Sequence, residues 1–339
     1  MTENESTGAA RGDASCADHA AGAREALAAA SPCRLCPRDC GARRLEGGTG
    51  FCRAGGTPRL YRYGPHFGEE PPLAGTRGSG ALFFSHCTLR CLYCQNHPWS
   101  QEGAGEDVSV DGLTDRLRQL AASGCHNWNL VSPTPWLPWI REAARPLFRA
   151  GIRLPFVYNT SGFESQETLA AFADLIDIAL IDLRYARETT ARGASACDAY
   201  VATARTALRW LWEQLGPLET DAAGVARRGV ICRLLVLPGR ADEAVANLEW
   251  LATVTGAGIH ISVMSQYTPV HQARRLPGWD RRVGADEYAR VTDAVERLGF
   301  ENGWVQEYAT ETPADLLGCE MPAGKGAVGR AQPVCRSDH

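Results

Sequence analysis

Three cysteines lie within eight positions of one another in this 339-residue chain, in the stretch HCTLRCLYCQN. They are Cys87, Cys91 and Cys94, and they follow directly on the apolar run ALFF. In a reducing compartment such a group indicates metal binding or catalysis, and three thiols cannot all form disulfides with one another. Three thiolates suit a cubane iron–sulfur cluster with one iron that lacks a protein ligand. A zinc site with His86 or His97 as fourth ligand is the alternative, and coincidental core cysteines are a weaker one.

Four further cysteines form a second set nearer the N-terminus: Cys33, Cys36, Cys40 and Cys52. Four thiolates are a complete ligand set for zinc or for a second iron–sulfur cluster. Residues 32–75 are dense in Cys, Gly, Arg and Pro and contain few apolar residues, so this stretch cannot build a core by itself. We therefore favour a structural metal knot that folds residues 33–60. An electron-relay cluster is the alternative, and cysteines that bind no metal are a third.

From residue 81 onwards, short apolar runs alternate with amphipathic stretches. The apolar runs cover 81–86, 127–132, 154–159, 177–183, 230–239 and 259–267. The helical patterns cover 111–123, 139–150, 165–175, 197–215, 241–255 and 284–299. Near-continuous apolar strands separated by helices are typical of parallel β/α units. Six such units predict an α/β fold, a partial (β/α)6 TIM-like barrel over residues 76–309, and an open doubly wound sheet is the runner-up.

Composition bounds the remaining segments and the partners. Residues 1–31 are rich in Ala, Gly and Ser and predict a mobile leader without the features of a secretory signal, and residues 310–339 predict an irregular tail. The formal net charge is −4 at pH 7, so no broad basic field indicates nucleic acid. No apolar run approaches the ~20 residues that cross a bilayer. We expect a cytoplasmic protein without a nucleic-acid or membrane partner.

In barrels and in open parallel sheets, chemistry takes place at the carboxyl ends of the strands. The three-cysteine loop follows the first predicted strand, so it would lie at that mouth. Polar side chains also follow or end the later strands: Ser132, Thr134, Asn159, Thr160, Ser161, Asp182, Arg184 and Gln266. Arg233 lies inside an apolar run, and a buried arginine requires an anionic partner such as Asp182 or a ligand carboxylate. A zinc hydrolase would need histidines at several strand ends, and the eight histidines do not fall there.

These motifs carry a family resemblance. C-x3-C-x2-C after the first strand, with Tyr93 before the third cysteine, resembles the signature loop of the radical S-adenosylmethionine (SAM) superfamily. The phrases CRLCPRDC, HCTLRCLYCQN, YNTSGFES, LVLPG and MSQYTP are similar to those of proteins like the pyruvate formate-lyase-activating enzyme, a glycyl-radical-enzyme activase. The resemblance runs from about Cys33 to Glu307, which is most of the chain.

The resemblance implies an activity. Cys87, Cys91 and Cys94 would hold a 4Fe-4S cluster whose fourth iron binds SAM, and one electron would split SAM into methionine and a 5′-deoxyadenosyl radical that abstracts a substrate hydrogen. It also implies an electron donor such as flavodoxin or ferredoxin. The substrate would be a glycyl-radical enzyme or another protein, with a small molecule as the alternative. A zinc-binding barrel protein without radical chemistry is the hypothesis from a different class.

The resemblance also implies roles in SAM binding. Tyr93 would contact adenine, and Asn159, Thr160 and Ser161 would bind ribose or the methionine carboxylate. Asp182 and Arg184 match an Asp-x-Lys pair of activases, with arginine in place of lysine. The superfamily often carries Gly-Gly-Glu after the second strand, but this chain has SPTPW, where Ser132 and Thr134 would serve instead. Gln266 would border adenine or substrate. Ordinary packing for Tyr93, a structural Asp–Arg pair, a helix N-cap at Ser161 or Ser165 and a core amide at Gln266 are the alternatives.

Overall fold

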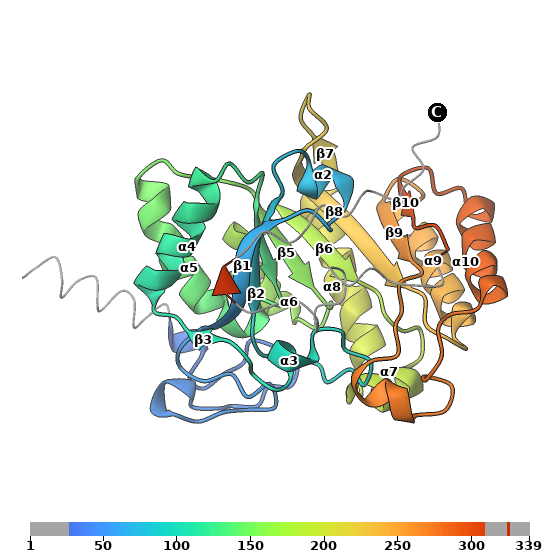
Figure 1. Ribbon diagram of the computed structural model, residues 1–339, viewed down its shortest axis with the longest axis horizontal. Coiled ribbons are helices and arrows are strands. Elements are labelled where there is room, and N and C mark those ends of the chain that lie inside the picture. Colours follow the sequence, from blue (N-terminus) through green and yellow to red (C-terminus); the bar gives the residue numbers. More distant parts are fainter. Residues whose placement is uncertain (1–26, 309–323, 326–339) are drawn as a thin grey trace, which may run out of the picture.

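A parallel sheet organises the chain, whose computed structural model describes residues 27–308 and 324–325. Seven parallel strands lie side by side in their order along the chain: β2 (Ser79–Phe84), β4 (Trp128–Val131), β5 (Phe156–Thr160), β6 (Ile178–Asp182), β8 (Ala226–Leu235), β9 (His260–Met264) and β10 (Gly303–Val305). A doubly wound sheet would reverse its strand order at a switch point, and this order has no reversal. The predicted partial barrel of the α/β class is confirmed, and the runner-up is excluded (Figure 1).

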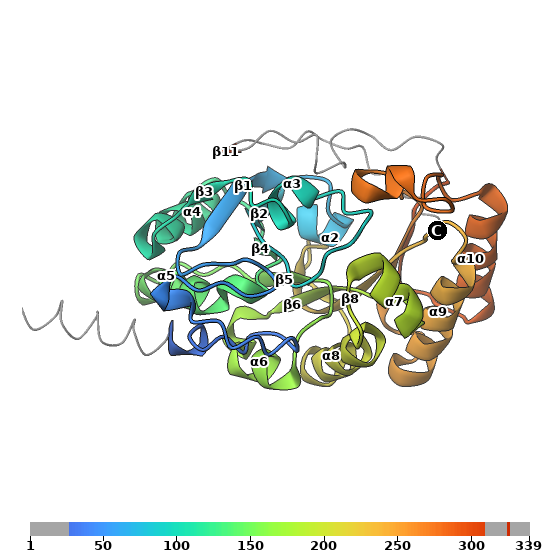
Figure 2. The ribbon, with the colours of Figure 1, turned by 90° about the horizontal axis from the view of Figure 1, so that it is seen from below.

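Six helices connect these strands: α4 (Val110–Ala122), α5 (Leu137–Arg149), α6 (Gln166–Ala171), α8 (Tyr200–Leu215), α9 (Ala241–Thr255) and α10 (Ala285–Arg297). They line the outer face of the curved sheet (Figure 2). Leu82, Leu130, Ile181 and Cys232 belong to the large apolar core cluster between sheet and helices. The Ser165 hydroxyl accepts the Thr168 N–H at 3.2 Å and caps α6, which is the local role that the sequence left open for this serine.

The sheet does not close into a full barrel among the described strands. At one end lies β10, and at the other β1 (Arg59–His66) pairs antiparallel with β2. The short strands β3 (Glu106–Asp107) and β11 (Gly324–Lys325) pair with β1, and β7 (Glu219–Thr220) pairs with β8. The sequence analysis placed residues 59–66 in the cysteine-rich segment, whereas the structure makes them a strand of the main sheet.

The short helices and the chain ends complete the description. The short helices are α2 (Pro71–Ala74), α3 (His97–Ser100), α7 (Glu188–Ser195) and the 3-10 turns η1 (Leu27–Ala29), η2 (Arg44–Glu46), η3 (Thr134–Trp136), η4 (Ala173–Leu175) and η5 (His271–Arg275). The predicted leader up to residue 26, and the predicted tail apart from β11, lie outside the described residues. Within the described ranges, no helix combines the length and the apolar character that a membrane crossing requires.

The inner face of the sheet changes character along the strands. Near the strand starts, Leu73 of α2 packs against Val157, Leu180 and Ile231 in a small apolar cluster. Two residues further along β5, β6 and β8, the same face carries Asn159, Asp182 and Arg233. Because side chains alternate between the faces of a strand, these polar groups point into the lumen at the carboxyl ends of the strands. The barrel is therefore plugged at one end and opens into a polar cavity at the other.

Candidate active site

The three-cysteine loop lies over this cavity, as predicted. Cys87, Cys91 and Cys94 all line a cavity of about 210 Å³ together with side chains from the ends of β4, β5, β6, β8 and β9. The end of α7 anchors the loop, because the Arg90 N–H donates to the Ser195 carbonyl at 3.1 Å and the Leu92 N–H donates to the Ala194 carbonyl at 2.8 Å. None of the helical patterns in the sequence covers α7 (Glu188–Ser195).

Each of the three sulfurs has its own hydrogen-bonding neighbour. The Leu89 N–H donates to Sγ of Cys87 at 3.5 Å, and the Ser195 hydroxyl donates to Sγ of Cys91 at 2.9 Å. The Ser100 hydroxyl lies 3.2 Å from Sγ of Cys94. Hydrogen bonds of this kind favour the thiolate form and are typical of the groups around metal ligands.

Burial makes two of these thiols, those of Cys87 and Cys94, weak acids. It raises the pKa of Cys87 to about 12 and that of Cys94 to about 11, and the neighbouring Cys91 thiol adds to both shifts. Thiols with such pKa values hold their protons at neutral pH, so a metal that binds here has to displace them. Cys87 and Cys94 are therefore not suited to act as free nucleophilic thiolates at neutral pH.

The spacing of the sulfurs indicates the kind of metal group. Among the described residues, only one group of three potential ligands brings its atoms within 4.8 Å of one another, and it contains no cysteine. Zn–S bonds of about 2.3 Å in a tetrahedron place sulfurs only about 3.8 Å apart. An iron–sulfur cluster separates them more widely, because each cysteine binds a different iron. The donor set thus fits a cluster better than a single zinc ion.

Neither histidine proposed as a fourth zinc ligand lines the cavity. The His86 ring lies 6.0 Å from the ring of Trp136, and burial lowers its pKa to about 4. His97 turns its Nδ1 to the Cys94 carbonyl oxygen, 3.2 Å away, and its Nε2 toward Glu102.

Tyr93 lines the cavity and is firmly held. Its ring stacks on that of Trp279, with centroids 5.4 Å apart and planes at 9°. Its hydroxyl lies 2.7 Å from the Tyr185 hydroxyl, which lies 2.5 Å from the Ser195 hydroxyl. Because Ser195 donates to Cys91, a buried hydrogen-bond chain runs from Tyr93 to a cysteine of the trio. Sequence reasoning missed Tyr185 and Ser195, which lie far from the cysteine motif in the chain.

The floor of the cavity is a network around Arg233. Its guanidinium donates to Oδ1 of Asp182 at 2.8 Å, to Oδ1 of Asn159 at 2.8 Å and to Oε2 of Glu69 at 3.3 Å. Asp182 is therefore one anionic partner that the sequence required, and Glu69 is a second that it missed. Burial raises the pKa of Glu69 above its ordinary value, although Arg233 opposes the shift. Only the adjacent acids of GEEPP, in a stretch without helical pattern, hinted at Glu69.

Arg184 reaches from the same network toward the cysteines. Its Nη2 lies 2.5 Å from Oδ2 of Asp182, and its Nη1 lies 4.0 Å from Sγ of Cys91. Its Nε is a buried donor with no hydrogen-bond partner among the described residues. The structural Asp–Arg pair exists, and Arg184 still has one donor left for an anionic ligand.

Nine of the ten residues predicted to hold SAM come together at this cavity: Tyr93, Ser132, Asn159, Thr160, Ser161, Asp182, Arg184, Arg233 and Gln266. Ser132 leaves its strand with a φ of 58°, a left-handed conformation that is uncommon outside glycine. Thr134 is the exception, because it lies two residues farther on, in η3, and lines a second cavity.

That second cavity, of about 20 Å³, lies among the four N-terminal cysteines: Cys33, Cys36, Cys40 and Cys52. Burial raises the pKa of Cys36 to about 12, and the other three thiols add smaller contributions to the shift. A Cβ at Gly50 would lie 2.4 Å from the sulfur of Cys40, so a side chain at this position would force that sulfur to move. The four cysteines therefore surround one small cavity, with Cys33 buried and Cys40 exposed, and no three of their sulfurs lie within 4.8 Å of one another.

Arg44 supplies a buried positive charge beside this set. It is 1% exposed and stacks on Trp136 and Trp139, with centroid distances of 4.9 and 4.7 Å. Its Nη1 donates to the Pro135 carbonyl at 2.6 Å and lies 3.9 Å from Sγ of Cys33. None of the ion pairs within the described residues includes Arg44. A buried guanidinium needs an anion, and cysteinates on a metal would provide it.

A buried carboxyl, Glu164, lies between the two cavities. Its Oε1 accepts hydrogen bonds from Thr134 at 2.6 Å and from Thr160 at 2.7 Å, and each threonine lines a different cavity. Burial raises the pKa of Glu164 above its ordinary value, and the two hydroxyls oppose the shift. Nothing in the phrase YNTSGFES distinguished this residue from a surface acid.

No family model matches the chain. An uncharacterized protein of Methanocaldococcus jannaschii is 22% identical over 275 residues, which is 79% of this chain and 75% of that protein.

Three solved structures share part of the architecture. SuiB of Streptococcus suis bound to S-adenosylmethionine is 12% identical, with a TM-score of 0.44, over 67% of this chain and 48% of that one. Native anSMEcpe with bound AdoMet is 11% identical, with a TM-score of 0.43, over 63% and 58%. The FeFe-hydrogenase maturase HydG of Carboxydothermus hydrogenoformans is 13% identical, with a TM-score of 0.47, over 78% and 58%. The chain thus spans about half of each structure, and these matches do not establish its family.

Proposed function

We propose that this chain is a radical SAM enzyme in which Cys87, Cys91 and Cys94 hold a 4Fe-4S cluster and the cavity beside them binds SAM. One observation carries the proposal. Three buried or half-buried cysteines, each with a hydrogen-bonding neighbour at its sulfur, line a polar cavity at the carboxyl ends of the strands, and their sulfurs do not all lie within 4.8 Å of one another, as the ligands of a single zinc ion would. When bound, the cluster and SAM would supply an electron and a 5′-deoxyadenosyl radical for hydrogen abstraction.

The residues around the cavity divide into two groups. Arg233 donates hydrogen bonds to Asp182, Asn159 and Glu69. We therefore expect it to position these side chains and not to bind SAM itself. Arg184 keeps a buried donor, and we assign it to the carboxylate of SAM.

Hydroxyl and amide groups at the mouth are left for the polar parts of the nucleoside: Ser132, Thr160, Ser161 and Gln266. The ring of Tyr93, held by Trp279, provides a flat wall for adenine. Among the described residues that line the cavity there is no pair of adjacent glycines, so we propose that the contact to the methionine amino group differs from the usual superfamily pattern.

We propose a second iron–sulfur cluster at Cys33, Cys36, Cys40 and Cys52, in preference to the zinc knot that the sequence favoured. Two observations support it. No three of the four sulfurs lie within 4.8 Å of one another, whereas a zinc tetrahedron places its sulfurs about 3.8 Å apart, and Arg44 provides a buried counter-charge beside them. The two cavities also share a wall, because Thr88 lines the second cavity and follows Cys87 in the chain. A relay of electrons from flavodoxin or ferredoxin to the SAM cluster fits this arrangement.

Anaerobic reconstitution with iron and sulfide, followed by reduction with SAM, tests the main proposal. We expect 5′-deoxyadenosine as a product and a cluster EPR signal that SAM perturbs. Cys91→Ala abolishes both, whereas Cys125→Ala, which removes a buried thiol of the core, leaves both in place. Cleavage of SAM that survives Cys91→Ala would refute the assignment.

Metal analysis of Cys36→Ala separates the two sites. Loss of about four irons from the reconstituted protein supports the second cluster. Loss of zinc alone would instead restore the structural knot.

The finer proposal concerns the substrate. Following the resemblance of residues 33–307, we propose a protein substrate, such as the glycine-bearing loop of a glycyl-radical enzyme. A glycyl-radical EPR signal on a co-purifying partner, or a mass change on a partner peptide, would support it. A mass change on a small molecule, with none on a partner protein or peptide, would support the alternative of a small-molecule substrate.

A further inference from the structure

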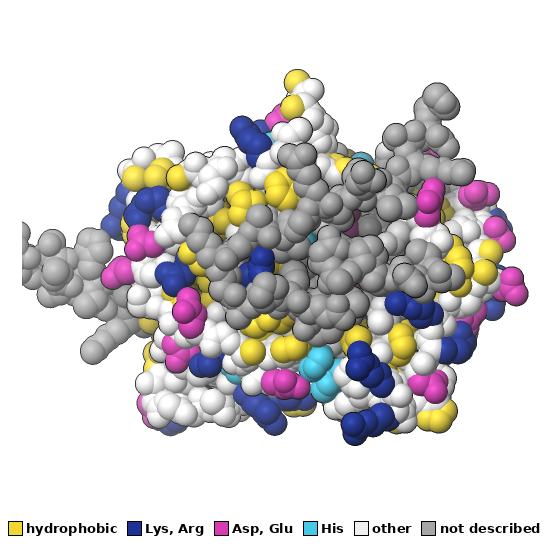
Figure 3. All heavy atoms as spheres, in the orientation of Figure 1, with side chains coloured by type: hydrophobic (Ala, Val, Ile, Leu, Met, Phe, Trp, Pro, Cys, Tyr) yellow, Lys and Arg dark blue, Asp and Glu magenta, His cyan; other side chains and the backbone are white. Residues whose placement is uncertain are grey.

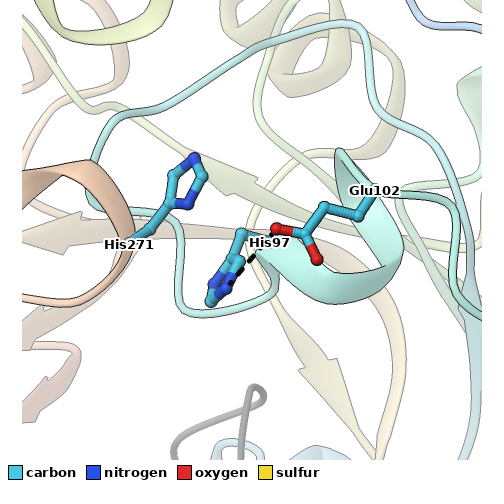
Figure 4. A group of neighbouring side chains, drawn as sticks. All are labelled: His97, Glu102 and His271. Atoms are coloured by element: carbon cyan, nitrogen blue, oxygen red, sulfur yellow. Dashed lines mark ion pairs between the residues drawn. The ribbon is translucent and has the colours of Figure 1, made fainter.

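Two histidines and a glutamate converge on the outer surface of the cysteine loop. His97 lies at the start of α3, Glu102 follows that helix, and His271 lies at the start of η5 (Figure 4). Potential ligand atoms of the three residues all lie within 4.8 Å of one another, which no other trio of His, Cys, Asp or Glu in the described residues achieves. Figure 3 shows histidine side chains exposed on this face of the molecule, next to an acidic side chain.

The two ring nitrogens of His97 have different neighbours. Nδ1 lies 3.2 Å from the carbonyl oxygen of Cys94, an acceptor that requires the proton on Nδ1. In the neutral ring Nε2 then carries the free lone pair, and this nitrogen lies 3.9 Å from Oε1 of Glu102. Histidines that bind metals commonly donate their other ring N–H to a carbonyl in this way, which fixes the tautomer and the direction of the ring.

His271 is brought to the same point by an unusual backbone. Its φ is 53°, a left-handed conformation, and its ring lies over that of His97 with centroids 4.5 Å apart and planes at 19°. Strained positions of this kind are commonly found where function fixes a side chain. An exposed amide, that of Gln272, lies 3.3 Å from Nε2 of His271 and would give way to an ion at that nitrogen.

We propose that His97, Glu102 and His271 bind a divalent ion of the zinc class, with water completing the coordination. Two imidazoles and one carboxylate are a ligand set that zinc accepts. Bonds of about 2.0–2.2 Å would draw the ligand atoms closer together and turn the rings out of their stack. These side chains are exposed or half-buried, so they can make that change without moving the barrel.

The ion would join two segments that already touch. The Ala273 N–H donates to the Leu92 carbonyl at 3.0 Å, and the Gln95 amide donates to the Gln266 carbonyl at 3.1 Å. A metal between His97 and His271 would lock the loop after β9 onto the cysteine loop, from outside the cavity. This inference does not depend on the proposed radical chemistry.

Zinc titration of the full-length reconstituted protein tests the site, with X-ray absorption at the zinc edge as the readout. We expect about one equivalent of zinc with a nitrogen and oxygen shell at about 2.0–2.1 Å and no sulfur shell at about 2.3 Å. His271→Asn, which keeps a side chain that tolerates the left-handed backbone, and Glu102→Gln each remove that equivalent. Glu301→Gln, a change at an exposed acid outside the trio, retains it.

Three outcomes would overturn the inference: no zinc bound beyond the cysteine sites, a sulfur shell on the additional zinc, or an unchanged zinc content in both His271→Asn and Glu102→Gln. The test remains valid if the protein takes up no iron during reconstitution. Zinc bound to the vacant thiols would then be present equally in the parent protein and in every variant. The difference of one equivalent between the parent protein and His271→Asn would therefore still be measured.

Discussion

Replacing the buried carboxyl between the two cavities, by Glu164→Gln, is expected to change how stability depends on pH. Glu164 is 2% exposed, and its Oε1 accepts the hydroxyls of Thr134 and Thr160. Its Oε2 has no hydrogen-bond partner among the described residues. Burial is the largest influence on this carboxyl and raises its pKa above the ordinary value. Glutamine has nearly the same shape and cannot ionise, so the exchange isolates the effect of the charge.

The sign follows from proton linkage. Below the pKa of the unfolded chain, about 4.3, the acid is protonated in both states and contributes no pH dependence. Between that value and the raised pKa of the folded state, the unfolded chain releases the proton first, so stability falls as pH rises. The loss is about 1.4 kcal/mol for each pH unit in this window. Above the folded pKa the difference is constant.

The stability of Glu164→Gln relative to the parent protein should therefore rise with pH by about 1.4 kcal/mol per unit across that window. The unpartnered amide of glutamine costs about 1–3 kcal/mol, but that cost is the same at every pH. The slope, and not the offset, carries the prediction. Urea unfolding of both proteins at equal metal content, between about pH 4.5 and 8, measures it.

Glu167→Gln serves as the control, because it removes an exposed carboxyl three residues away in the first turn of α6. Because the Glu167 carboxyl is in contact with water in both the folded and the unfolded state, we expect no such slope for this variant. Infrared spectroscopy gives a second readout, since a protonated Glu164 contributes a carboxylic C=O band that Glu164→Gln removes. A pH-independent difference between Glu164→Gln and the parent protein would refute the reasoning, and it would show that Glu164 ionises as easily when folded as when unfolded.

Three further predictions concern charges and hydrogen bonds near the cysteines. Ser195→Ala removes the donor to Cys91, so the reduction potential of the cluster should fall by up to about 60 mV in a redox titration, and an unchanged potential would contradict this. Arg44→Met removes the buried cation beside the second set, so that set should bind its metal more weakly. In competition with a chelator, its apparent affinity for the metal should be about 10–100-fold lower than in the parent protein, and an equal affinity would count against the role given to Arg44. Arg233→Met removes the cation paired with Glu69 and leaves Asp182 with Arg184 alone, so it should lower the free energy of unfolding by about 3–5 kcal/mol, whereas a loss below about 1 kcal/mol in urea would contradict the network.

The six predicted strands all exist, because fully buried parallel strands are written as near-continuous apolar runs. What the sequence did not reveal are the elements with weaker signals. In β1, buried and half-buried side chains alternate strictly, a period of two that the nearby Gly, Arg and Pro obscured. The eight residues of α7 end in Ser195, and nothing in them suggested that this helix end would hold the cysteine loop.

The candidate site shows the same division between local and distant information. Residues directly after strands could be predicted, because strand ends of a parallel sheet meet at one edge. Thr134 does not line the cavity of the three-cysteine loop, although it lies only two residues after Ser132. The chain turns into η3 after Ser132 and carries the threonine to the other cavity. Glu69 and Glu164 could not be found, because their roles come from partners on other segments and not from their own neighbours in the sequence.

The two cysteine sets are best understood as one structure with two centres. Arg38 donates to the Thr88 carbonyl at 2.8 Å, and Arg90 donates to the Phe51 carbonyl at 2.9 Å, so each loop holds the backbone of the other. Residues 33–60 cannot form a core alone, and the loop between Cys87 and Cys91 has little regular structure. Metal at the four-cysteine set would thus also fix the wall behind the three-cysteine loop. A purely structural role and an electron-relay role consequently demand the same contacts, and only the metal bound there separates them.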